Sequence, residues 1–84
     1  MSKKVQTAKN IELTQKLIEY LINGENIPNL PQDVSFVPFS KTDKKLNNAN
    51  EELLKLLSKE EKPVVIAEEP QTNKGSWELI PVNF

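Results

Sequence analysis

Three short apolar segments recur along the chain, and proline interrupts the interior of only two of them. The segments span residues 34–40, 63–69 and 76–83, and their Val, Ile and Phe content predicts β-strands. Pro38 lies inside the first segment and Pro81 inside the third, whereas the second has no proline after its first residue. Because proline cannot donate to a hydrogen-bond ladder, it is confined to edge strands. The pattern therefore predicts a three-stranded sheet in the order 1-2-3, with the second strand central.

The segment that ends at Asn23-Gly24 predicts a first helix, which begins at Thr7 or Asn10. We expect residues 1–6 to form a polar lead and Gly24 to close the helix in the left-handed conformation. The apolar side chains of this helix spread over roughly 200°, wider than the stripe of an ordinary surface helix. The helix therefore needs cover on two sides. One face carries Leu13, Leu17, Tyr20 and Leu21, and a neighbouring face carries Ile11, Ile18 and Ile22.

A second helix is expected from Thr42 or Asp43 to Lys59, with its leucines along one side. A helix between the first two strands makes those strands parallel, and the short turn 71–75 makes the last two antiparallel. The order α-β-α-β-β predicts an α/β fold on the border of α+β, with a three-stranded mixed sheet and two helices. We expect the second helix to cover one face of the sheet. The first helix then covers the other face or packs beside the second.

The chain has 84 residues, which predicts a single domain over residues 1–84. Residues 24–33 form a linker between the first helix and the first strand, because Pro28 and Pro31 exclude helix there. Ile27 and Leu30 are expected to pin this linker to the core.

Composition excludes several kinds of chemistry. The chain contains no cysteine, no histidine and no arginine, so thiolate, imidazole and ordinary zinc chemistry have no residues to use. We therefore expect no catalytic activity and no cofactor. A formal net charge of -1 argues against nucleic acid as a partner. Trp77, Phe36 and Phe39 are expected to pack in the core or an interface rather than to stack on bases.

No segment has the character of a membrane anchor or a signal peptide. The longest unbroken apolar run, residues 64–67, is far shorter than a membrane span. Lys3 and Lys4 are not followed by an apolar stretch of the kind that directs secretion. We expect a cytoplasmic protein without a membrane partner.

Polar residues follow the first two strands and mark a candidate ligand or contact site. Lys41, Thr42 and Asp43 come after the first strand, and Glu68 and Glu69 end the second. Open α/β sheets bind ligands at the carboxyl ends of their strands. A helix start could hold an anion there, but the segment has no glycine and Asp43 has the wrong charge. Helix capping and ordinary strand-end charge are the competing interpretations.

Asn50 is also a candidate site residue, because it interrupts the apolar side of the second helix. A polar group in such a place must find hydrogen-bond partners, or its burial costs about 1–3 kcal/mol. It could bond to the linker backbone, fix the register of a helix interface, or contact a ligand. Asn47 and Asn48 are expected to face outward.

Four short motifs stand out along the chain: Asn10-Ile11-Glu12-Leu13, Leu30-Pro31-x-Asp33, Asn47-x-x-Asn50-x-x-Leu53 and Lys62-Pro63-Val64-Val65. Together they resemble a family of short, uncharacterised prokaryotic proteins over about residues 8–68. The resemblance implies a helix-strand-helix-strand arrangement, a prokaryotic or phage origin, and no assigned activity. Residues 71–84 lie outside it.

Taken with the wide apolar arc of the first helix, these features predict a non-catalytic protein-interaction or regulatory module that forms a homodimer. The identity of any other protein partner is not encoded in a recognisable motif. The alternative is a small-ligand or anion-binding protein that uses the carboxyl ends of the first two strands.

Overall fold

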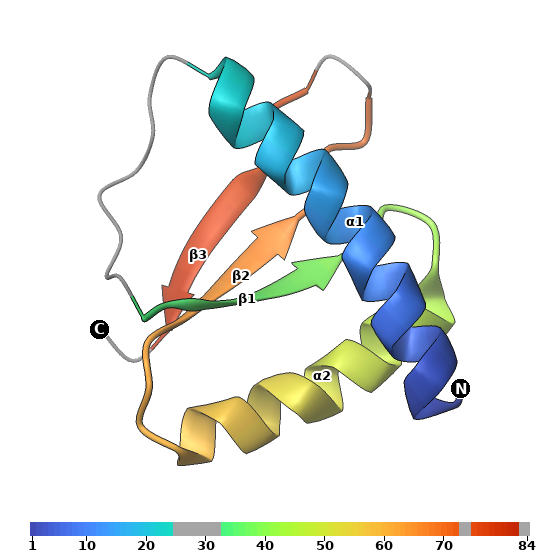
Figure 1. Ribbon diagram of the computed structural model, residues 1–84, viewed down its shortest axis with the longest axis vertical. Helices are drawn as coiled ribbons and strands as arrows, with labels where there is room; N and C mark the ends of the chain where they lie inside the picture. Colours follow the sequence, from blue (N-terminus) through green and yellow to red (C-terminus); the bar gives the residue numbers. More distant parts are fainter. Residues whose placement is uncertain (25–32, 73–74, 83–84) are drawn as a thin grey trace.

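The computed structural model describes residues 1–24, 33–72 and 75–82, which contain two helices and three strands (Figure 1). Residues 25–32 of the predicted linker lie outside the described part. They include both prolines of the linker and the residues that were expected to hold it against the core, Ile27 and Leu30. The elements follow the predicted order α-β-α-β-β, and each strand is shorter than its apolar segment. The elements are α1 (Lys3–Asn23), β1 (Ser35–Phe39), α2 (Lys44–Lys59), β2 (Val64–Glu68) and β3 (Glu78–Val82).

The sheet has the predicted order, with β2 at its centre. β1 pairs with β2 in parallel, and β2 pairs with β3 in antiparallel orientation. Pro38 is opposite Ala67 in the first pairing, and Pro81 is opposite Val65 in the second. Both prolines thus lie on edge strands, where the missing N–H group costs least. The expectation of a three-stranded mixed sheet flanked by two helices is confirmed, and the fold is of the α+β kind.

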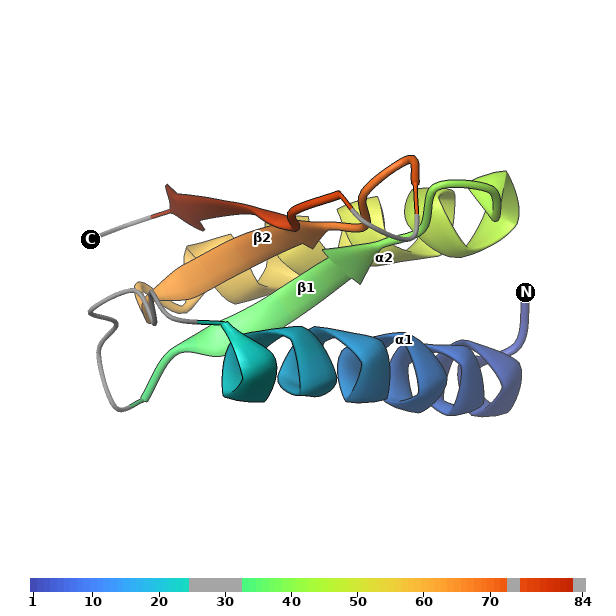
Figure 2. The ribbon, with the colours of Figure 1, turned by 90° about the horizontal axis from the view of Figure 1, so that it is seen from above.

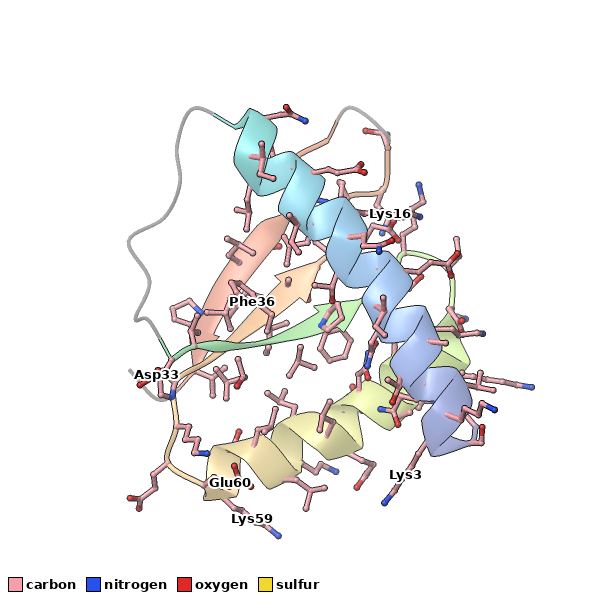
Figure 3. The ribbon with its side chains drawn as sticks, viewed as in Figure 1. Lys3, Lys16, Asp33, Phe36, Lys59 and Glu60 are labelled. Atoms are coloured by element: carbon pink, nitrogen blue, oxygen red, sulfur yellow. The ribbon has the colours of Figure 1, made fainter. Side chains whose placement is uncertain are left out.

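The two helices lie on different sides of the sheet (Figures 1 and 2). On the α1 side, Leu13 and Leu17 form the core with Ala67 and Trp77, and α2 adds Leu46 to the same cluster. Phe36, labelled in Figure 3, packs against this cluster, so the prediction that Phe36 and Trp77 pack internally is confirmed. α2 packs against β1 and β2. Because side chains alternate along a strand, fully buried Val37 lies on the face opposite Ala67.

Both ends of α1 differ from the prediction in detail. The helix begins at Lys3 rather than at residue 7 or 10, because the hydroxyl of Ser2 accepts a hydrogen bond from the Val5 N–H at 3.2 Å and caps it. Residues 3–6 are therefore helical. The helix ends at Asn23 as expected, but Gly24 is extended, with φ -82° and ψ 146°. A Cβ atom there would lie 3.1 Å from the Tyr20 carbonyl oxygen, so close backbone approach explains this glycine.

α2 has the predicted bounds, and Asp43 is its cap. The Asp43 carboxylate accepts a hydrogen bond from the Leu46 N–H at 3.0 Å. At the other end, the N–H of Glu60 donates to the Leu57 carbonyl at 3.1 Å. Glu61 then adopts a left-handed conformation with φ 57°, which turns the chain back towards β2. Glycine is the residue that adopts this conformation without strain.

Candidate functional site

The carboxyl edge of β1 and β2 gathers four of the six candidate residues. The two strands are parallel, so the segments that follow them leave at the same edge of the sheet. Lys41, Thr42 and Asp43 lie in the turn between β1 and α2, and Glu69 lies directly after β2. The hydroxyl of Ser40 shapes this turn by accepting hydrogen bonds from the N–H groups of Thr42 at 3.2 Å and Asp43 at 3.1 Å. The structure therefore brings these four candidate residues together at one edge of the sheet, as the sequence predicted.

Asn47 braces the same turn from the first part of α2. Its side-chain amide donates to the Ser40 carbonyl at 2.8 Å, and its side-chain oxygen accepts from the Ser40 N–H at 2.7 Å. The side chain thus pairs with one backbone residue as a neighbouring strand would. The expectation that Asn47 faces outward is wrong, whereas Asn48 is exposed as predicted.

Glu69 links three parts of the fold. Its side chain is only 8% exposed. One carboxylate oxygen accepts from the Lys41 N–H at 3.1 Å, and the other lies 3.5 Å from the Lys16 ammonium on α1. Its backbone N–H donates to the Phe39 carbonyl at 2.9 Å and extends the pairing of β1 and β2 by one residue. Its carboxylate is therefore held by structural contacts.

A second ion pair joins α1 to the start of α2. The Lys9 ammonium lies 2.7 Å from a carboxylate oxygen of Asp43. The hydrogen bond from Lys9, followed by the one from the Leu46 N–H, lowers the pKa of Asp43 below its ordinary value. Lys9 and Lys16 were not predicted as site residues, because their contacts depend on how α1 crosses the carboxyl edge of β1 and β2. Their spacing of seven residues, which places them on one side of a helix, is the signal that could have found them.

Two shallow clefts flank the Lys16–Glu69 pair. One has a volume of about 300 Å³ and the other about 240 Å³. Both are lined by lysines together with carboxylates, including Glu19 in the first and Glu12 in the second. The mixture of charges suits a polar or zwitterionic molecule better than a simple anion. In the described ranges no three acidic side chains come close enough to hold a metal ion.

The other two candidate residues lie apart from these clefts. Glu68 is the last residue of β2 and is exposed, and it pairs in register with Phe39 and Glu78. Because side chains alternate along a strand, Glu68 points to the opposite side of the sheet from Glu69.

Asn50 is fully buried, and its side chain has a partner for each bonding position. Its amide donates to the Pro38 carbonyl at 2.8 Å and to the Asn10 side chain at 2.8 Å. Its oxygen accepts from Asn10 and from Gln6, both at 3.0 Å. The suggested bond to the linker backbone is absent from these contacts. Asn50 instead locks α1, α2 and β1 together, which is a structural role.

The outward side of α1 is the most exposed apolar feature among the described residues. Ile11, Ile18 and Ile22 are 56%, 47% and 74% exposed. Leu13 and Leu17, on the other side of the same helix, are buried. The two-sided apolar helix predicted from the sequence therefore has one side in the core and the other exposed in the single chain.

A third hollow, an apolar groove of about 390 Å³, lies where the first half of α1 passes α2. Its apolar lining comes from Ala49, Leu53 and Leu56 of α2. Leu56 is 61% exposed, so this groove is a second apolar surface. Across the described part of the chain, neither helix has the length and apolar character that would let it cross a membrane.

Fold and site together define a small α+β domain with shallow polar clefts and an exposed helical face. Residues 6–79 match DUF5647, a family of unknown function, and the chain belongs to this family. The resemblance to an uncharacterised family is thereby confirmed, and the match continues past residue 68 to the start of β3. No curated protein and no solved structure matches the chain.

Proposed function

We propose that this chain is a non-catalytic protein-interaction or regulatory module that self-associates through the outward side of α1. The observation that supports this proposal is the exposure of Ile11, Ile18 and Ile22 along one side of a helix whose other side is in the core. Contiguous exposed apolar residues of this kind mark protein contact surfaces. Covering them removes apolar area from water at about 25 cal/mol per Å².

The chemistry of the carboxyl edge supports a binding role over a catalytic one. Glu69 and Asp43 accept backbone hydrogen bonds and form ion pairs with lysines. These contacts hold both carboxylates within the fold, and the hydrogen bonds to Asp43 lower its pKa, which opposes a role for it as a general acid. The absence of histidine and cysteine from the sequence also supports a binding role over a catalytic one.

The proposal also includes a cytoplasmic location, a prokaryotic origin and no nucleic-acid partner. A net charge of -1 without arginine supports the last of these, because phosphate backbones are bound by clustered basic residues.

The alternative function is small-ligand binding at the carboxyl ends of β1 and β2. The two clefts beside the Lys16–Glu69 pair support it, since they lie where open sheets place ligands. Their openness to solvent and mixed charges favour weak binding of a polar molecule. A ligand whose affinity falls on Lys16→Ala but is unchanged by Ile18→Asp would favour this alternative.

The test is the oligomeric state measured by light scattering at about 100 μM. We expect a dimer mass for the wild-type chain and a monomer mass for Ile18→Asp. Leu56→Asp is the matched control, because Leu56 is an exposed apolar residue on α2, and this variant should remain a dimer. A monomeric wild type, or a dimer that survives Ile18→Asp, would contradict the proposal. Loss of the dimer in the control alone would assign the contact to the groove between the helices.

A further inference from the structure

The last residue of α1 begins an Asn-Gly pair. Of the asparagines in the sequence, only Asn23 is followed by glycine, at Gly24. Glycine has no Cβ atom, so its backbone nitrogen is open to the side chain that precedes it. Asparagine side chains reach neighbouring backbone groups, and asparagine is among the thermolabile residues. The side-chain carbonyl carbon of Asn23 and the backbone nitrogen of Gly24 can therefore approach each other with little hindrance.

Both residues are exposed and lie where the regular helix stops. Gly24 is extended, with φ -82° and ψ 146°, so the helical backbone does not continue past Asn23. The terminal turns of helices fray, and fraying frees the Asn23 side chain to turn towards the nitrogen of the next residue. A Cβ atom at position 24 would lie 3.1 Å from the Tyr20 carbonyl oxygen, so a residue other than glycine would crowd this end of α1.

The other asparagines in the described ranges are held or flanked differently. Asn10, Asn47 and Asn50 each donate a side-chain hydrogen bond within the fold. Asn48 is exposed, but it lies inside α2 and alanine follows it. The regular helix and the Cβ atom of that alanine hinder an attack on Asn48 by the next backbone nitrogen. Among the described asparagines, Asn23 is therefore the most open to attack by its own backbone.

We infer that Asn23 is a site of spontaneous deamidation, a covalent modification for which water is the co-reactant. The backbone nitrogen of Gly24 loses its proton and bonds to the side-chain carbonyl carbon of Asn23, and the bond from that carbon to the amide nitrogen breaks. Ammonia leaves with the proton, and a cyclic succinimide remains. Water then opens the ring at either carbonyl and gives aspartate or isoaspartate at position 23. No atom is oxidised or reduced, because the net change is hydrolysis of an amide.

The product places a new carboxylate at the C-terminal end of α1. That end of a helix carries a partial negative charge, which disfavours an anion. Glu19 lies one turn earlier on the same side of α1, and like charges at this spacing are destabilising. Isoaspartate also adds a carbon atom to the backbone, which the regular hydrogen-bond ladder does not accommodate. Deamidation at Asn23 therefore loosens the last turn of α1.

The new carboxylate also changes the first cleft, the one of about 300 Å³ beside the Lys16–Glu69 pair. Asn23 lines this cleft at the end of α1 that lies beside the segment after β2 (Figure 1). The charged residues in the lining are two lysines, Lys16 and Lys41, and two glutamates, Glu19 and Glu69. An acidic product at position 23 gives this balanced set an excess of negative charge. The modified cleft therefore favours cationic over anionic molecules.

Incubation of the purified chain at neutral and at mildly alkaline pH tests the inference. Peptide mass spectrometry with fragmentation locates the conversion of amide to acid. We expect conversion at Asn23 that is faster at the higher pH, because the attacking nitrogen must lose its proton, and none at Asn48 over the same period. Gly24→Ala should slow the reaction about tenfold, which corresponds to about 1.4 kcal/mol in the barrier.

Asn23→Gln is the conservative control, since it keeps the amide but closes a larger ring, and position 23 should then stay unconverted. Conversion at Asn23 that is no faster than at Asn48, or that is unchanged in folded Gly24→Ala, would overturn the inference. Circular dichroism of each variant checks that the fold is retained.

Asn23→Asp measures the consequence for α1 without waiting for the reaction. We expect a melting temperature about 2–4 °C below that of wild type, from the helix dipole and the charge of Glu19. Asn48→Asp adds the same charge near the start of α2, where an anion is not disfavoured, and should not lower the melting temperature. Equal melting temperatures for Asn23→Asp and wild type would overturn the loosening of α1.

Discussion

The side-chain amide of Asn50 donates a 2.8 Å hydrogen bond to the carbonyl oxygen of Pro38. Pro38 lies in an edge strand, so a carbonyl directed away from β2 has no neighbouring strand to bond. α2 supplies the missing donor from a fully buried asparagine, and the same side chain also holds Asn10 of α1. One residue thus completes the sheet edge and sets the position of both helices against it.

We therefore expect Asn50→Ala to lower the free energy of unfolding by about 2–4 kcal/mol. The change leaves the Pro38 carbonyl and the Asn10 amide without their partner, and unsatisfied buried polar groups cost about 1–3 kcal/mol each. Urea denaturation monitored by circular dichroism measures the change. Asn48→Ala, on the exposed side of the same helix, should stay within about 0.5 kcal/mol of wild type. Equal effects of the two substitutions would contradict the role assigned to Asn50.

Glu69→Gln should lower the free energy of unfolding by about 1–2 kcal/mol. The wild-type carboxylate is 8% exposed and accepts from the Lys41 N–H and from Lys16, and hydrogen bonds to charged groups are stronger than neutral ones. Lys16 is largely exposed, so most of the effect comes from the part-buried hydrogen bond with the Lys41 N–H and should persist at high salt. Glu68→Gln is the control, since Glu68 is exposed and should show a change below about 0.5 kcal/mol. Loss of the difference in 0.5 M salt would assign it to the surface ion pair instead.

Asp43 predicts a pH dependence of stability. Its pKa is lower in the folded chain than in the unfolded one, because of the hydrogen bonds from Lys9 and the Leu46 N–H. Its stabilising contribution is therefore present above the unfolded pKa of about 3.9 and is lost as the pH falls through the lower folded pKa. Asp43→Asn should be less stable than wild type at pH 7, and the difference should shrink as the pH falls below about 4. Melting temperatures of both proteins from pH 7 to pH 2 test this, and a constant difference across that range would contradict it.

The fold could be predicted where a single residue type restricts what its backbone can do. Pro38 and Pro81 identified the two edge strands, because the missing N–H group of proline is known from the sequence alone. The start of α1 was not predicted, because the first turn is polar and its cap, Ser2, lies outside the apolar pattern. Gly24 was read as a left-handed cap, but its close approach to the Tyr20 carbonyl depends on where the chain goes next.

The candidate site, too, could be predicted only in part. Parallel pairing was sufficient to bring Lys41, Thr42 and Asp43 beside Glu69. The partners Lys9 and Lys16 come from a helix far away in the sequence, and the angle at which that helix crosses the sheet follows from packing. Residue spacing along α1 could show that the two lysines share a side of the helix, but not which carboxylates they meet.

Glu61→Gly should stabilise the fold, in contrast to most substitutions. Glu61 follows α2 with φ 57°, a left-handed conformation that costs an L-residue about 1 kcal/mol and costs glycine almost nothing. Glycine loses more entropy on folding, which offsets part of the gain, so we expect a net increase of about 0.5 kcal/mol in the free energy of unfolding. Glu60→Gly is the matched control, because Glu60 is in the right-handed helical region with φ -82° and ψ -1°. That substitution should destabilise the chain by about 0.5–1 kcal/mol, and urea denaturation of both variants measures the two changes. A loss of stability in Glu61→Gly as large as that in Glu60→Gly would show that the left-handed turn is absent in solution.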